Sequence, residues 1–181
     1  MDTSNYRRGE DPARQPQART LEQMAAGLGL RVIAVDTGGN RLVADIAEDL
    51  AAALADDDRV RAYELLLEVV DTLDQADDVT RILLSSTPPR SLNTQWYAAI
   101  AGVVEWKLSA ESALPIPQWV AHNTRTRELI WTPSGDSHKD IDERNVPDPL
   151  SNRGVWLDAS ALISRDDVID PVDELRTTLG E

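Results

Sequence analysis

The chain has 181 residues and a mass of 20.0 kDa, which is enough for one domain with a buried core and too little for several large domains. Hydrophobic residues make up 41% and charged residues 28% of it, so disorder along the whole chain is excluded by composition. Asp and Glu number 32 against 18 Lys and Arg, a formal net charge of -14. A body this acidic repels a phosphate backbone, so a basic partner suits it better than nucleic acid.

Cysteine is absent, which removes disulfides, thiolate metal sites and thiol nucleophiles and agrees with a cytoplasmic location. No apolar run approaches the ~20 residues of a membrane span, and Met1 is followed by Asp2 rather than by a signal peptide. Phe is also absent, while Trp occurs five times. A core of Leu, Val, Ile and Ala with a few Trp favours helices over sheets. We expect a cytoplasmic, mainly α-helical protein without membrane contact.

The N-terminal residues 1–18 are polar and read as a flexible basic arm. Thr20 then has the character of a helix N-cap, and Gly27 and Gly29 supply an ending. The apolar residues between them recur at helical spacing: Leu21, Met24, Ala25 and Leu28. The pattern predicts a short amphipathic helix.

A β-hairpin is predicted next. The β-branched run at residues 31–35 and the apolar run at residues 41–46 flank the pair Gly38 and Gly39. A Gly-Gly pair between two short apolar runs is typical of a tight turn joining two strands. The fold class we predict is therefore a helical domain with a small β-hairpin or short strands.

Three longer helices follow in the pattern. The first begins near Asp45 and is interrupted at residues 56–58, where Asp58 caps the second. The third runs from about Leu92 to Leu108, after the prolines at 88 and 89. The predicted inner faces are Ile46, Leu50, Ala53 and Leu54; Val60, Tyr63, Leu66 or Leu67, Val70 and Leu73; and Trp96, Ile100, Val103, Val104 and Lys107.

The last third contains most of the prolines. Pro117 marks a helix start with Trp119 behind it, and residues 134–149 form a long acidic turn-rich loop. Residues 155–157 read as a short strand that leads into a helical turn capped by Asp158 or Ser160.

The sequence contains few groups of residues with the spacing of a catalytic or metal site. His122 and His138 are not spaced as zinc ligands on a helix, and the carboxylates near His138 lack the register of a calcium loop. A hydrated acidic loop is favoured there, so we expect no enzyme activity, no metal and no cofactor. One alternative from a different class stays open: a small metal-dependent hydrolase that uses His122, His138, Asp136 and Asp140.

The first thirty residues resemble the closing half of an Xre-type helix-turn-helix domain. The residues that match its phrases are Ser4, Tyr6, Arg8, Gly9, Pro16, Thr20, Leu21, Met24, Ala25, Ala26, Leu28, Gly29 and Leu30. The resemblance implies an N-terminally truncated family member, since the family's first two helices would precede Met1. Residues 1–30 would then be a partial helix-turn-helix remnant and residues 31–181 an acidic helical interaction domain.

Residues 42–165 resemble a Trp-containing C-terminal domain that often follows such a helix-turn-helix in high-GC bacteria. The phrases that carry the resemblance are LLLEVVDTL, PPRSLNTQWYAAIAGVVEWKL, PIPQWV, the pair Trp131 and Pro133, and RGVWLD. Proteins of this kind look like antitoxins or regulators encoded beside a toxin. The resemblance implies a non-enzymatic antitoxin or regulatory component of a toxin-antitoxin-like pair, which neutralises a basic toxin by stoichiometric binding.

Candidate binding residues follow from this interpretation. Trp96, Trp119 and Trp131 are the predicted partner anchors, because large rings dominate protein interfaces. Arg7 and Arg8 are the predicted DNA contacts through the N-terminal remnant, whose DNA binding would need completion by a homodimer or by upstream residues. The main alternative is an Xre-type DNA-binding transcriptional regulator with a C-terminal sensing or dimerisation domain.

Overall fold

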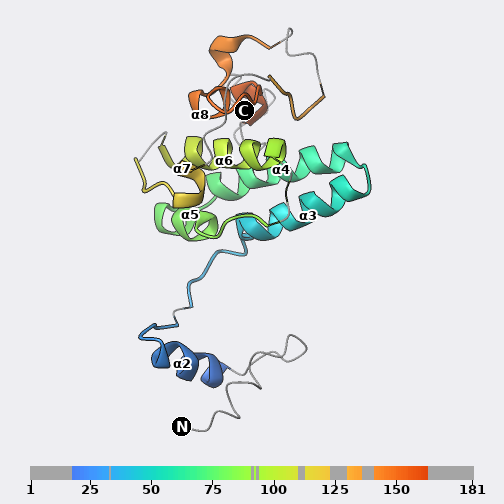
Figure 1. The fold of residues 1–181 in the computed structure, drawn as a ribbon. Helices are drawn as coiled ribbons and strands as arrows, with labels where there is room; N and C mark the ends of the chain where they lie inside the picture. The colour runs from blue at the N-terminus through green and yellow to red at the C-terminus, as the bar shows by residue number, and fades with distance from the viewer. Residues whose placement is uncertain are drawn as a thin grey trace, which may run out of the picture. The chain divides into compact units, whose positions relative to one another are not determined.

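The structure is a computed structural model that describes residues 18–32, 34–90, 92, 94–109, 113–122, 130–135 and 141–162 (Figure 1). The chain divides into two compact units, residues 1–36 and 37–181, where the sequence places a boundary after residue 30. Helices and short helical turns supply nearly all regular structure in the described ranges. The predicted mainly α fold class is confirmed.

The first unit contains helix α2 (Ala18–Gly27). It begins before Thr20, so the predicted N-cap lies inside the helix instead. Its end is built as predicted around Gly29, whose φ is 73°. The Leu30 N–H donates to the Ala25 carbonyl at 2.8 Å and the Gly29 N–H to the Ala26 carbonyl at 3.1 Å, the paired bonds of a Schellman motif.

The predicted β-hairpin is wrong. The turn itself forms: Gly38 and Gly39 have φ of 63° and 82°, and the Asn40 N–H donates to the Thr37 carbonyl at 3.0 Å. No strand follows among the described residues, because helix α3 (Val43–Ala55) begins directly after Leu42. A helix buries Val43 and Ile46 together on one face, whereas a strand would turn them to opposite faces.

Helices α3 and α4 (Arg59–Asp74) pack against each other along their lengths. The predicted Asp interruption is confirmed: Asp57 has a positive φ of 56°, and the Asp58 carboxylate accepts from the Arg61 N–H at 2.9 Å. Val60 was predicted to lie on the inner face but is 73% exposed. The later part of the predicted inner face is confirmed, since Leu66, Val70 and Leu73 are buried, and Leu65 and Val69 are buried beside them.

Helix α5 (Asp78–Ser85) was not predicted from the sequence. Asp77 caps it by accepting from the Thr80 N–H at 2.8 Å. The Arg81 Nε donates to the Leu73 carbonyl at the end of α4 at 2.7 Å. An eight-residue helix this close to α4 reads in sequence as a continuation of it, which is why the pattern did not separate the two.

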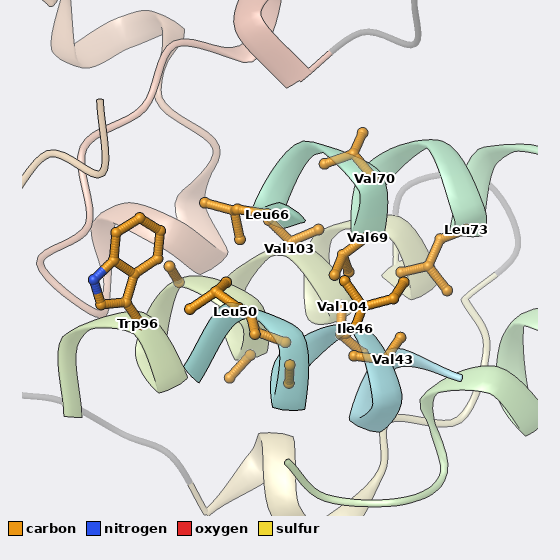
Figure 2. Close-up of a cluster of buried hydrophobic side chains, with 14 of the residues drawn as sticks. Val43, Ile46, Leu50, Leu66, Val69, Val70, Leu73, Trp96, Val103 and Val104 are labelled. Atoms are coloured by element: carbon orange, nitrogen blue, oxygen red, sulfur yellow. The ribbon is translucent and has the colours of Figure 1, made fainter. Parts of the chain in front are cut away.

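Helix α6 (Thr94–Ser109) packs against α4, α7 and α8 (Figure 1). Its predicted inner face is confirmed, since Ile100, Val103 and Val104 are fully buried. Figure 2 shows Val103 and Val104 meeting the buried side chains of α3 and α4, with Trp96 at one end of the cluster. Most of the core is aliphatic, as the composition indicates.

Short elements complete the second unit. They are α7 (Gln118–Ala121), η2 (Glu143–Asn145), α8 (Asp148–Ser151) and η3 (Ala159–Leu162). Pro117 is the N-cap of α7, as predicted. Asp158 is the cap of η3, accepting from the Ser160 N–H at 2.8 Å. The predicted strand at 155–157 is reduced to one parallel bridge between Val155 and Trp131.

No helix in the described ranges combines the length and the apolar character that crossing a membrane requires. Of the predicted acidic loop at 134–149, residues 136–140 lie outside the described residues.

Candidate functional site

A cleft of about 560 Å³ lies in the second unit, within the size range of ligand sites. Three segments form it: the turn between α3 and α4, the first turn of α6, and residues 131–135. Its lining residues are Leu54, Asp57, Arg59, Val60, Tyr63, Gln95, Trp96, Trp131, Thr132, Pro133, Ser134 and Gly135.

Two tryptophans form the aromatic wall of the cleft. The rings of Trp96 and Trp131 meet edge to face, with centroids 5.0 Å apart and planes at 73°. Trp96 is 5% exposed and belongs to the core, whereas Trp131 is only partly buried. Trp131 is the ring that a ligand can reach over a larger area.

The backbone holds Trp131 in place. Its N–H donates to the Gly154 carbonyl at 2.9 Å, and its carbonyl accepts from the Trp156 N–H at 2.8 Å. These two hydrogen bonds form the parallel bridge between Trp131 and Val155, which lies in the segment after α8. Because Trp96 is fixed by the core and Trp131 by this bridge, the wall is formed before any partner arrives.

The turn between α3 and α4 gives the cleft an acidic rim. Asp56, Asp57 and Asp58 are all exposed, and the Asp57 side chain keeps 92% of its surface in solvent. Arg59 Nε lies 3.8 Å from the Asp57 Oδ1, with the Arg59 side chain 82% exposed. An ion pair this exposed is loose and contributes little to stability, so the Asp57 carboxylate is accessible to a partner.

The structure places two of the three predicted anchors in the cleft and the third outside it. It brings Trp96 and Trp131 together in the cleft, although Trp96 is mainly a core residue. Trp119 lies elsewhere: its indole N–H donates to the Ser85 carbonyl at 2.9 Å, and its ring meets Tyr97 edge to face at 5.6 Å. Burial raises the pKa of the Tyr97 hydroxyl. The predicted DNA contacts Arg7 and Arg8 lie outside the described residues.

Several lining residues were not predicted as site residues. Tyr63 was assigned to the core face of its helix and Val60 likewise, while Leu54 was assigned to the face of α3. The turn at Pro133 and Gly135 carried a recognisable signal beside Trp131. No local sequence signal indicated that this turn lies beside the turn between α3 and α4.

Among the described residues, no group of three His, Asp or Glu side chains is placed to hold a metal ion. His122 is exposed and ends α7. The other residues of the predicted hydrolase alternative, His138, Asp136 and Asp140, lie outside the described residues.

No family model matches the chain, and neither a curated protein nor a solved structure matches it.

Proposed function

We propose that this protein is the antitoxin or regulatory component of a toxin-antitoxin-like pair, and that it neutralises a basic protein partner in the cytoplasm by stoichiometric binding without catalysis. The observation that carries the proposal is the preformed aromatic cleft beside an exposed acidic turn. Large aromatic side chains are enriched in protein-binding hot spots, and a polar rim commonly surrounds them.

The charge distribution supports a basic partner. Five arginines and five acidic residues cancel within residues 1–36, so residues 37–181 carry the whole net charge of -14. A field of this sign and size accelerates association with a positively charged surface. It also disfavours self-association of the acidic unit, since like charges repel.

A second candidate function is an Xre-type DNA-binding regulator. Exposed apolar side chains in and directly after α2 favour it, because Leu21 in the helix and Leu28 just beyond its end are 44% and 71% exposed. In a complete helix-turn-helix such residues would be covered by neighbouring helices. Regulation and neutralisation are compatible, since one chain can contact DNA through one unit and a protein through the other.

The proposed function is tested by capture and reconstitution. The tagged full-length protein is purified from its native host at moderate salt, and the retained proteins are identified by mass spectrometry. The proposal expects one basic protein in near-stoichiometric amount. The two purified proteins should then form a complex of fixed ratio, and the partner's toxicity should fall in proportion to the complex formed.

Recovery of the protein alone at every salt concentration would contradict the neutraliser proposal. DNA binding by the full-length chain would then be measured with a genomic fragment library. Specific retention of one fragment would favour the second candidate.

A further inference from the structure

We infer that the cleft between the α3–α4 turn and Trp131 binds an arginine side chain presented by a basic segment of the protein partner. The inference rests on the proposed function and names the chemical group that the site takes. Three features of the cleft carry it: the aromatic wall, the accessible carboxylate and the apolar side chains beside the α3–α4 turn.

The aromatic wall suits a guanidinium group. A planar guanidinium stacks on an indole ring and is attracted by its quadrupole. Trp131 is partly exposed and held rigidly by its backbone bonds to Gly154 and Trp156. The same chemistry already occurs inside this molecule, where the Lys107 Nζ lies 4.4 Å from the centroid of the Trp106 ring.

Asp57 supplies the negative charge. A guanidinium binds a carboxylate through two parallel hydrogen bonds, which a loose pair at 3.8 Å does not provide. Arg59 therefore leaves the Asp57 carboxylate available, and an incoming arginine would take it over. The neighbouring Asp56 and Asp58 add to the attraction and oppose an anionic ligand.

Apolar side chains line the part of the cleft beside the α3–α4 turn. Val60 is 73% exposed and lines the cleft together with Leu54 and Tyr63. An arginine places a three-carbon stem along such a surface while its charged end reaches a carboxylate. The volume of about 560 Å³ exceeds one side chain, so the cleft also admits the residues that flank the arginine.

The test uses the full-length protein and a blocked octapeptide of alternating arginine and glycine. The same peptide with citrulline in place of arginine is the neutral control, since citrulline keeps the shape and loses the charge. A glutamate-glycine peptide tests for an anionic ligand. Affinities are measured by titration calorimetry at low and moderate salt. The arginine peptide should bind at least about tenfold more tightly than either control.

A matched pair of variants localises the binding. Val60 is the second residue of α4 and 73% exposed, and Val79 is the second residue of α5 and 64% exposed. Val60→Arg and Val79→Arg make the same charge change at equivalent helix positions, but only Val60 lines the cleft. We expect Val60→Arg to weaken peptide binding about tenfold and Val79→Arg less than about twofold.

A second pair of variants tests the role of the Asp57 carboxylate. Asp57→Asn should weaken binding by about threefold to tenfold, while Glu48→Gln, an equal charge change on the exposed side of α3, should leave it within about twofold. All four sites are exposed, so folding is retained, and circular dichroism verifies this for each variant.

The outcomes separate the inference from the proposed function. Equal weakening by Val60→Arg and Val79→Arg would show diffuse electrostatic binding and overturn the arginine site, while a captured basic partner would still support neutralisation. Preference for the citrulline or glutamate peptide would also overturn the arginine site. Cleft-specific arginine binding in a protein that captures no basic partner would uphold the site and overturn the neutraliser proposal.

Discussion

Arg153 and Glu105 form a partly buried ion pair, with Arg153 Nη2 2.5 Å from the Glu105 Oε2. The same guanidinium donates to the carbonyls of Val120 at 3.0 Å and Pro149 at 2.7 Å. Arg153 is only 5% exposed. One buried cation therefore ties the short helices α7 and α8 to the long helix α6, and so supports the segment that carries the bridge to Trp131.

Replacing Arg153 should destabilise the fold. Arg153→Ala removes the cation beside Glu105 and one donor from each of two carbonyls, so we expect the free energy of unfolding to fall by about 3 kcal/mol. Urea unfolding followed by circular dichroism measures it. Arg144→Ala is the control, because that side chain is 88% exposed in its pair with Asp142, and its loss should leave stability nearly unchanged. Equal losses would refute the role of Arg153.

Gly102 is required by the close approach of α6 and α8. A Cβ at this position would lie 2.6 Å from the Leu150 Cδ2 and 3.2 Å from the Leu150 Cα. Gly102→Ala gains about 1 kcal/mol of helix propensity but overpacks the interface by about 1–3 kcal/mol. We expect net destabilisation of about 1 kcal/mol in chemical unfolding.

A double-mutant cycle tests the cause of that loss. Combining Gly102→Ala with Leu150→Ala removes the clashing side chain, so the pair should cost less than the sum of the two single changes. Additive losses would mean that the Gly102 and Leu150 contact is not responsible.

Lys107 and Asp74 form a second partly buried pair. Their Nζ and Oδ2 atoms are 2.6 Å apart, and the side chains are 12% and 20% exposed. Asp74→Asn leaves the Lys107 charge with only the Trp106 ring and the distant Leu162 carbonyl, so stability should fall by about 1–2 kcal/mol. Adding Lys107→Met should recover part of this loss. A double variant that loses more stability than the sum of the two single losses would contradict the pairing.

Trp119 should contribute to stability and not to binding of the peptide. Trp119→Phe removes the N–H that bonds the Ser85 carbonyl and should lower stability by about 1 kcal/mol. Binding of the arginine-glycine peptide should not change, because Trp119 does not line the cleft. Calorimetric titration of the folded variant measures this. A loss of peptide binding with intact folding would place Trp119 in the interface, as the sequence predicts for it.

Acid should weaken the cap of α5. The backbone N–H of Thr80 bonds the Asp77 carboxylate and lowers its pKa below the ordinary value of 3.8. A carboxyl group with a depressed folded pKa stabilises the fold above its unfolded pKa, and that contribution is lost as the pH falls through the folded pKa. The stability advantage over Asp77→Asn should therefore be present at pH 7 and shrink towards pH 3.

Unfolding by urea at the two pH values measures the advantage. Glu48→Gln makes the same charge change without removing a cap and serves as the control. An advantage of wild type over Asp77→Asn that stays constant with pH would contradict the role of the charged cap.

The sequence alone determined most of the helical framework. The spacing of Ile46 and Leu50, the cap at Asp58 and the ending at Gly29 are local signals, and the structure builds each as predicted. Such signals suffice because a helix satisfies its backbone hydrogen bonds within four residues. The aliphatic character of the core follows from composition, because the composition limits which apolar residues are available to be buried.

Tertiary structure decided the rest. Val43 begins a helix rather than a strand because α4 and α5 offer a surface that buries one helical face. Val60 fits the helical period but lies beyond the end of that surface and remains exposed. The cleft joins Asp57 to Trp131 across a long stretch of chain. Contacts between residues so far apart depend on how the helices pack, and no local pattern encodes them.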